Sequence, residues 1–433
     1  MGTLVFLVYG GLFAALTVRH FSYALVALIC MFAYEQWGGI NLAYVAQNGS
    51  VVNLALILLA LIGWFRLPPG SSLEHFMYPV RVAITLLLLY AFISTLWAPT
   101  DARATGRFMD GVHYLIVVVA IAPLLVMKPE NVTRVLDVVT TVGGLLVILF
   151  AYVPSFEGRG IVYEYDFEET LSLPLTLGTF AGSVMIISMV RLRGGLLPTL
   201  WALVVSGSAI FLIVKTGSRG QLIFSLAALM FCLPARWKRL SLNKVMIYVL
   251  LGLMAAGAFL VVLNTENTLS ARIRNADQST QTRVEMISIL MEAWSAGGPE
   301  VLIFGLGSSA SWSQELVQFY PHVVPLEVLG ELGFVGFALF SWIVLSLFMK
   351  AYSGQVKSQL PQQTLNDYSA LFGCFVFALL ISCKQGTLIY STDLFMYAAL
   401  AEKTFVLGGK ALQDRAASAS RRRRFRRSML QRT

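Results

Sequence analysis

Runs of apolar residues, each long enough to cross a lipid bilayer as a helix, recur along almost the whole chain. A membrane-spanning helix takes about 20 mostly apolar residues, and about thirteen such runs can be marked here. The predicted ranges are 3–18, 21–37, 51–65, 82–98, 110–127, 133–153, 170–190, 196–214, 220–235, 245–263, 325–349, 368–383 and 388–406. We therefore predict an all-α integral membrane protein with about 12–13 transmembrane helices.

The composition excludes the main classes of soluble protein. Of the 433 residues, 57% are apolar and 13% are charged, whereas a soluble domain has about 45–50% apolar and about 25% charged residues. A cytosolic enzyme, a disordered chain and a disulfide scaffold are all inconsistent with these values. The four cysteines lie in or beside apolar runs and form no CxxC pair, so neither a zinc site nor a redox couple is expected.

The position of the charges predicts the orientation of the chain. The net charge is +9, and residues 410–433 carry nine Lys or Arg residues against one acidic residue. Because cytoplasmic loops are rich in Lys and Arg, we expect this tail to be cytoplasmic, and it can also contact anionic lipid. Alternation then places the basic loops 191–195 and 236–244 inside. The same count places the segments 99–108, 154–169, 215–219 and 264–324 outside.

Four parts follow from this orientation. They are a transmembrane bundle over 1–263 that includes the TGSRG turn, an outer loop over 264–324, C-terminal transmembrane helices over 325–408 and a basic cytoplasmic tail over 409–433. Within the outer loop, apolar residues at helical spacing predict an amphipathic helix lying on the membrane rim and capping a cavity. These residues are Val284, Ile287, Leu290, Met291 and Trp294. Gly297, Gly298 and Pro299 are expected to end that helix.

Lys and Arg are disfavoured on the outer side of the membrane, so those that occur there call for a functional or structural explanation. In KTGSRG, Lys215 and Arg219 stand with Ser218 in a tight turn that opens the next helix. A helix N-terminus offers backbone N–H groups, and a guanidinium can bind two phosphate oxygens at once, so the turn is a candidate anion site. Arg159 and Arg283 are further candidates in outer loops. The alternative is that these side chains reach toward lipid headgroups.

His322 is the candidate general base. It lies in YPHVVPLEVLGELGFVG, where the outer loop enters the following span. An imidazole there can accept a proton from a hydroxyl near neutral pH, although a structural hydrogen-bonding role is the alternative. The chain has no GxxxxGK[ST], GxSxG or HExxH motif. We therefore expect no nucleotide, metal or other cofactor.

Four segments in order resemble the bacterial O-antigen ligase and polysaccharide polymerase superfamily. They are TGSRG at 216–220, TRVEMISILMEAW at 282–294, PEVLIFGLGSS at 299–309 and PHVVPLEVLGELGFVG at 321–336. The resemblance covers about residues 154–345. One difference is Val323, because members of the family commonly have Asn after the histidine.

The resemblance implies the architecture of C-type glycosyltransferases and glycan transfer, without a metal, from an undecaprenyl diphosphate carrier. The reaction would occur at the periplasmic face of the bacterial inner membrane, with 264–324 as the catalytic loop. Arg219, Arg283 and Arg159 would match arginines that bind the diphosphate, and His322 the histidine that deprotonates the acceptor.

Two acceptors remain open at this point. A second lipid-linked repeat unit would make the protein a polymerase of O-antigen or exopolysaccharide, whereas lipid A-core would make it an O-antigen ligase. We favour the polymerase. A flippase or transporter for lipid-linked oligosaccharides is a third hypothesis, and it predicts charged residues in the middle of the spans. The expected partners are the lipid-linked donor, the acceptor, membrane lipids and proteins of polysaccharide export or chain-length control, but no nucleic acid.

Overall fold

The computed structural model describes residues 2–67, 78–100, 111–112, 114–154, 156–157, 160–161, 174–192, 195–236, 276–353 and 360–430. Within these ranges the secondary structure is helical apart from one short antiparallel hairpin, β1 (Phe156–Glu157) and β2 (Gly160–Ile161), in which Phe156 pairs with Ile161. This confirms the predicted all-α class. Arg159 and the predicted span 245–263 lie outside the described residues.

The helices up to the hairpin are α1 (Gly2–Arg19), η1 (Phe21–Tyr23), α2 (Ala24–Asn41), α3 (Ala43–Gln47), α4 (Gly49–Phe65), α5 (Pro79–Ser94), η3 (Val117–Ile121), η4 (Ala122–Leu125), α7 (Pro129–Val138), η5 (Val139–Gly143) and α8 (Gly144–Tyr152). The later helices are α9 (Pro174–Val190), α10 (Leu196–Lys215), α11 (Arg219–Arg236), α14 (Ala276–Ala296), α15 (Gly298–Phe304), η7 (Ala310–Trp312), α16 (Val324–Tyr352), α18 (Gln362–Ser382) and α19 (Thr392–Leu430). Several begin with proline in the first turn, where its missing N–H costs no hydrogen bond: α5, α7, α15 and α16.

The predicted apolar ranges overlap helices throughout the described part of the chain. Among the described residues, 6 helices are long and apolar enough to cross a membrane. They are Gly2–Arg19, Phe21–Asn41, Pro129–Tyr152, Leu196–Lys215, Val324–Tyr352 and Gln362–Ser382. Shorter apolar helices cover Gly49–Phe65, Pro79–Ser94, Tyr114–Leu125, Leu175–Val190 and Gly220–Cys232. The last helix, α19, is continuous across the predicted boundary between span and tail at residue 408.

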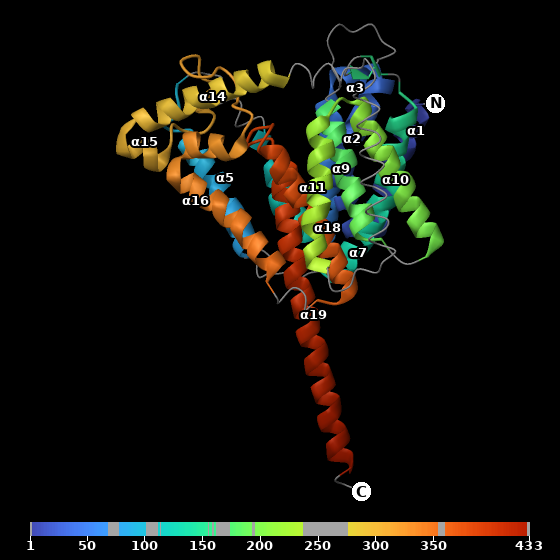
Figure 1. Cartoon of the computed structure of the whole chain (residues 1–433). Coiled ribbons are helices and arrows are strands. Elements are labelled where there is room, and N and C mark those ends of the chain that lie inside the picture. Colours follow the sequence, from blue (N-terminus) through green and yellow to red (C-terminus); the bar gives the residue numbers. More distant parts are fainter. Residues whose placement is uncertain are drawn as a thin grey trace.

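Figure 1 shows the arrangement of these helices. One group contains α1, α2, α7, α9, α10, α11 and α18, and α5 and α16 form an inclined pair beside it with α14 and α15 across one end. The helix α19 begins at the end where α14 and α3 lie and runs far beyond the opposite end. We call these the α14 end and the tail end of the molecule.

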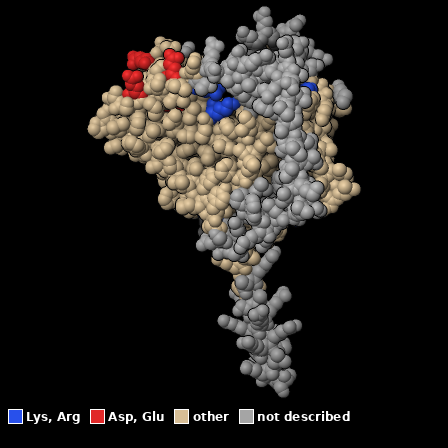
Figure 2. Space-filling view, viewed as in Figure 1, with Lys and Arg blue, Asp and Glu red and all other residues tan. Residues whose placement is uncertain are grey.

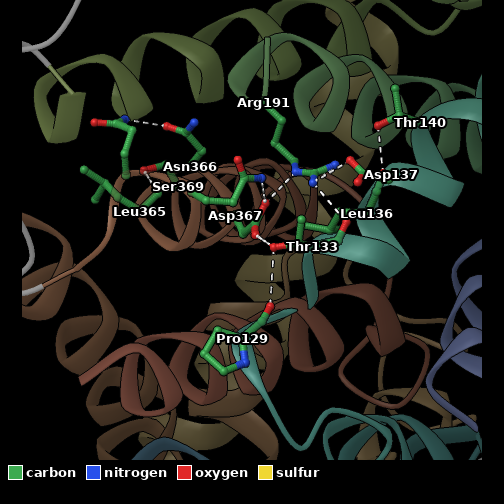
Figure 3. A network of polar contacts seen from close by, with 12 residues as sticks. Pro129, Thr133, Leu136, Asp137, Thr140, Arg191, Leu365, Asn366, Asp367 and Ser369 are labelled. Carbon is green, nitrogen blue, oxygen red and sulfur yellow. Dashed lines mark hydrogen bonds and ion pairs between the residues drawn. The ribbon is translucent and has the colours of Figure 1, made fainter. Parts of the chain in front are cut away.

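A buried ionic network joins three helices at the tail end (Figure 3). Arg191 follows α9, and its guanidinium pairs with Asp367 of α18 at 2.6 Å and with Asp137 of α7 at 2.8 Å. Its Nη2 also donates to the carbonyl of Thr133, whose hydroxyl donates to Asp367. Because a buried charge is tolerated when it is paired and hydrogen-bonded, Arg191 fixes these helices to one another.

A second buried carboxylate attaches the inclined pair to α19. Glu402 accepts hydrogen bonds from the N–H groups of Val80 and Arg81, both at 3.1 Å, and pairs with Lys350 of α16. A carboxylate at a helix N-terminus satisfies free N–H groups and complements the helix dipole. Glu402 therefore holds the start of α5 and the end of α16 against the same helix.

On the face drawn in Figure 2, the charged side chains shown in colour lie toward the α14 end. Acidic side chains gather over α14 and α15, where Glu285, Glu292 and Glu300 are exposed, and a basic patch lies next to them. The flank below, as far as it is drawn in colour, carries no charged side chains in this view. Large apolar residues are exposed on the helices, among them Leu345 on α16 at 58%. An uncharged apolar flank of this kind is what a lipid environment requires.

Candidate active site

The TGSRG turn joins α10 to α11 at the α14 end. Gly217 has φ 63°, a left-handed conformation that glycine adopts without strain. The hydroxyls of Thr216 and Ser218 lie 2.9 Å apart, and both residues are buried. The Ser218 hydroxyl thus stabilises the turn through a hydrogen bond within it. Arg219 is the first residue of α11, which places its backbone at the helix N-terminus; its side chain lies outside the described part of the structure.

Lys215, the last residue of α10, makes two contacts next to the turn. Its Nζ donates to the carbonyl of Ala151 at 2.9 Å and lies 4.9 Å from the ring centroid of Phe211. These contacts place the ammonium between α8 and α10. The predicted role of Lys215 in substrate binding stays a prediction.

Lys384, which was not among the residues selected from the sequence, lies against the TGSRG turn. An ideal Cβ built on Gly220 would fall 2.3 Å from the Nζ of Lys384. The ammonium therefore rests against the bare backbone of the first turn of α11. Lys384 belongs to the loop 383–391 between α18 and α19. Its signal in the sequence is the one used for Arg219, a cation on the side of the membrane where cations are disfavoured.

His322 lies within electrostatic range of Arg283, which comes from an earlier segment of the predicted outer loop. The His322 ring centroid lies 4.3 Å from that of Tyr320 and 5.4 Å from that of Phe319. Burial among these rings, and then the positive charge of Arg283 on α14, lower the pKa of His322 to about 4. Burial also raises the pKa of Tyr320, with Glu327 adding to the effect and Arg283 opposing it. At neutral pH the imidazole is uncharged and can accept a proton.

The backbone of His322 is held in an unusual conformation. Its φ is 63°, which is uncommon for a residue with a side chain and is found most often where function fixes the geometry. The next residue, Val323, is the N-cap of α16 and forms no side-chain cap. This is the position at which the family commonly has Asn, a good N-cap residue. Here α16 starts without that cap, and Pro325 lies in its first turn.

Two buried glutamates of α16 fix the segments around His322. Glu327 accepts hydrogen bonds from the Thr387 hydroxyl and from the N–H of Leu388 at 3.2 Å. It thereby ties the loop 383–391, which carries Lys384 on the TGSRG turn, to the start of α16 beside His322. Glu331 accepts from the N–H of Ser309 at 2.7 Å, and from the N–H and hydroxyl of Ser311 at 3.1 and 2.6 Å. It holds the turn that follows GLG.

A break in α16 explains the GLG sequence at 305–307. The predicted span 325–349 corresponds to α16, in which Gly333 is non-helical with φ 61°. The carbonyls of Gly330 and Glu331, which the break leaves without helical partners, accept from the N–H groups of Leu306 at 3.0 Å and Gly307 at 2.8 Å. The outer loop therefore completes the hydrogen bonding of the broken helix.

The amphipathic helix packs on this broken helix. Leu290 and Met291 of α14 lie against Gly330, and Trp294 meets the Phe334 ring at a centroid distance of 5.4 Å. Val284, at the start of the predicted apolar stripe, is 59% exposed. The stripe is thus buried only over its second half. The glycine and proline residues at 297–299 form a corner, because α15 begins directly after α14.

We expect Gly333→Ala to destabilise the protein by about 3 kcal/mol or more, because the positive φ and the close packing both disfavour a side chain at this position. An added Cβ would lie 2.4 Å from the carbonyl oxygen of Ile303 and 2.5 Å from the N of Gly305, both backbone atoms. Gly409→Ala is the control, because its Cβ meets nothing within 4 Å. The measurement is the thermal unfolding of the purified variants in nanodiscs. Equal midpoints for the two variants would contradict the described contact between the loop and α16.

Taken together, the described residues define a multi-pass membrane protein in which Glu327, close to His322, holds the loop whose lysine rests on the TGSRG turn. Residues 201–341 match the family model described as O-antigen ligase. The matched region runs from α10 to the first half of α16 and includes Arg219, Arg283 and His322. This match supports the O-antigen ligase and polymerase superfamily that the motifs predicted. A comparison with curated proteins gives no significant match.

Proposed function

We propose that this protein polymerises lipid-linked oligosaccharide repeat units into a surface polysaccharide or exopolysaccharide. The glycan would be transferred from an undecaprenyl diphosphate carrier at the periplasmic face of the bacterial inner membrane. The observation that carries the proposal is the hydrogen bonding of Glu327, near His322 in α16, to Leu388 of the loop that sets Lys384 on the TGSRG turn. Arg283 lies within electrostatic range of His322 and adds positive charge. The family-model match supports an enzyme that joins glycans.

In the proposed mechanism the donor diphosphate binds at the N-terminus of α11. Arg219, Lys384 and Arg283 supply positive charge, and the N–H groups of the first turn of α11 add hydrogen-bond donors. The anomeric C–O bond to the diphosphate breaks, and the released lipid diphosphate carries the negative charge that these groups stabilise. Arg159 stays a further candidate. Such charge stabilisation serves the purpose that a metal ion serves in other transferases, so we propose a metal-independent reaction.

His322 takes the proton from the acceptor hydroxyl as its oxygen attacks the anomeric carbon from the opposite face, giving inversion. A group with a pKa of about 4 is a weak base in the free protein. A diphosphate bound near Arg283 counters the charge that helps to lower this pKa. Donor binding therefore strengthens the base at the step where it is needed.

The alternative acceptor is lipid A-core, which would make the protein an O-antigen ligase. The description of the matching family as O-antigen ligase favours keeping this second function. A flippase for lipid-linked oligosaccharides is less consistent with the described charges, because the proposed site lies at the α14 end. The buried Arg191 and Glu402 and the half-buried Lys350 have their own partners at the other end of the helices.

The molecule in Figure 1 is consistent with a cytoplasmic C-terminus. The outer loop with α14 and the C-terminal end of α19 lie at opposite ends of the structure. If the α14 end faces the periplasm, the arginine-rich end of α19 faces the cytoplasm, in agreement with the excess of positive charge expected there. We therefore retain the outer loop as the catalytic segment and 409–433 as the tail.

The test is reconstitution of the full chain in nanodiscs with an undecaprenyl diphosphate-linked repeat unit as donor. A second repeat unit and lipid A-core are offered as acceptors in separate reactions, each with excess EDTA and without nucleotide. A ladder of products from repeat units alone supports the polymerase, whereas transfer to lipid A-core alone supports the ligase. Absence of both products would refute glycan transfer, and activity that EDTA abolishes would refute metal independence.

A further inference from the structure

A cavity of about 750 Å³ lies beside the proposed transfer site and uses none of its residues. Its walls come from α2, α4, α9, α18 and the start of α19, at the α14 end of the bundle. This volume falls within the range of about 300–1,000 Å³ typical of ligand pockets. No residue of α14 is among the described lining residues.

Two walls of the cavity are shared with the TGSRG turn. Thr176 and Thr179 of α9 line the cavity, and Gly178 between them packs against the side chain of Ser218. Gln385 lines another wall and directly follows Lys384, the lysine that rests on Gly220. A ligand in the cavity is therefore adjacent to the groups proposed to bind the donor diphosphate.

Asn53, one of the lining residues, has an unsatisfied hydrogen-bond acceptor. The side-chain amide donates to Glu35 at 2.8 Å and to the Tyr114 hydroxyl at 3.3 Å, which orients Asn53. Its Oδ1 is buried and has no hydrogen-bond partner, and the residue is 4% exposed. An unsatisfied buried acceptor is costly. A ligand that donates a hydrogen bond from inside the cavity would remove that cost.

The lining identifies the chemistry of the ligand. Carboxylates of Glu35 and Asp393, the Gln385 amide and hydroxyls of serine, threonine and tyrosine face one space, but Lys and Arg are absent from the described lining. Such a set suits neutral hydroxyl groups, which both donate and accept hydrogen bonds, and does not suit phosphate. The aromatic rings of Tyr114 and Tyr390 add apolar surface.

We propose that this cavity is a saccharide-binding subsite that holds sugar residues of one substrate next to the transfer site. The inference rests on the proposed glycan transfer and extends it by locating the carbohydrate. The sugars can come from the donor or from the acceptor, and the two sources share the same hydroxyl chemistry. The Asn53 oxygen accepts a hydrogen bond from one sugar hydroxyl, and Glu35 and Asp393 accept from others.

The experiment compares Asn53→Ala with Asn131→Ala in the full chain in nanodiscs. Asn131 lies on α7, is 6% exposed and does not line the cavity. Steady-state transfer is measured while donor and acceptor concentrations are varied in turn. We expect Asn53→Ala to raise the KM of one substrate about tenfold, as the loss of a hydrogen bond in a buried site predicts, with kcat nearly unchanged.

The substrate whose KM rises identifies the source of the sugar. An increase for the donor alone assigns the cavity to the donor glycan, and an increase for the acceptor alone assigns it to the acceptor. Unchanged KM values for both substrates, or the same change in Asn131→Ala, would overturn the proposal. If Asn53→Ala does not fold, Gln385→Ala in the half-buried loop takes its place with the same expectations.

A binding measurement separates this proposal from the proposed function. The probe is the oligosaccharide released by mild acid from the lipid-linked pool of the host cell. It should bind the unmodified chain and Asn131→Ala equally, and Asn53→Ala about tenfold more weakly. If the unmodified chain transfers no glycan but this difference holds, the proposed function fails and the saccharide site stands. Equal binding to all three proteins refutes the site.

Discussion

Substitution of alanine for His322 is expected to slow glycan transfer by roughly 100- to 10,000-fold, because the acceptor hydroxyl then loses its proton acceptor. The measurement is the initial rate of transfer by purified protein in nanodiscs at saturating donor. The control is His20→Ala, since His20 is also half-buried and its ring accepts from the N–H of Ser22 at 3.2 Å, away from the site. Near-normal transfer by His322→Ala would exclude His322 as the base.

The same residue predicts the pH dependence of the reaction. Because burial and Arg283 lower the pKa of His322 to about 4, the imidazole is neutral above that pH and protonated below it. Transfer limited by the free protein should therefore be level near neutral pH and fall as the pH decreases through about 4. Arg283→Gln removes the nearby positive charge, so it should raise the pKa and shift the fall to higher pH. An unshifted profile would show that Arg283 does not act on His322.

The second large effect is expected at the TGSRG turn. Arg219→Ala should lower transfer roughly 100- to 1,000-fold, because a guanidinium at the N-terminus of α11 would no longer stabilise the leaving diphosphate. Arg219→Lys retains the charge but not the bidentate geometry, so its activity should lie between those of the unmodified chain and Arg219→Ala. The readout is kcat/KM for the donor, with protein yield and unfolding temperature as checks on folding. Activity of Arg219→Ala within a few-fold of normal would contradict the anion site.

The two lysines near this turn provide a matched pair for the same assay. Lys384 rests on Gly220, whereas Lys215 is bound to the carbonyl of Ala151 and covers Phe211. Lys384→Gln should therefore raise the KM of the donor, and Lys215→Gln should mainly change thermal stability. The opposite pattern would favour the role that the sequence alone predicted for Lys215.

The sequence was most informative where a feature depends on neighbours along the chain. Apolar runs predicted the helices, and TGSRG predicted a tight turn that starts one of them. The position of Lys384 on that turn was missed, since it follows from how α18 packs on α11. Hydropathy likewise treats 325–349 as one span, because a single Gly333 in a long apolar run carries no signal of a break without knowledge of Leu306 and Gly307.

In the candidate site too, the sequence predicted individual residues but not how the fold places them. His322 and Arg283 were selected separately from motifs, and their electrostatic contact depends on the fold of the loop between them. The cavity around Asn53 was not predicted at all. Its lining is drawn from helices that lie far apart in the sequence, and Asn53 stands in an ordinary apolar run. Sequence patterns therefore identified the reactive groups better than the space that surrounds them.

The hydrogen bonds that hold the two ends of α5 involve residues far later in the chain, and this affects how the protein is made. This helix emerges early from the ribosome, but Glu402, which caps its N-terminus, lies 322 residues after Val80. Near its other end, Ser94 accepts from the N–H of Ser308 and the Tyr90 hydroxyl donates to the carbonyl of Phe304, each 214 residues later. Insertion and final docking of α5 are thus separate events in biogenesis. A chain arrested or truncated before α19 would contain α5 without the carboxylate that accepts from the N–H groups of Val80 and Arg81.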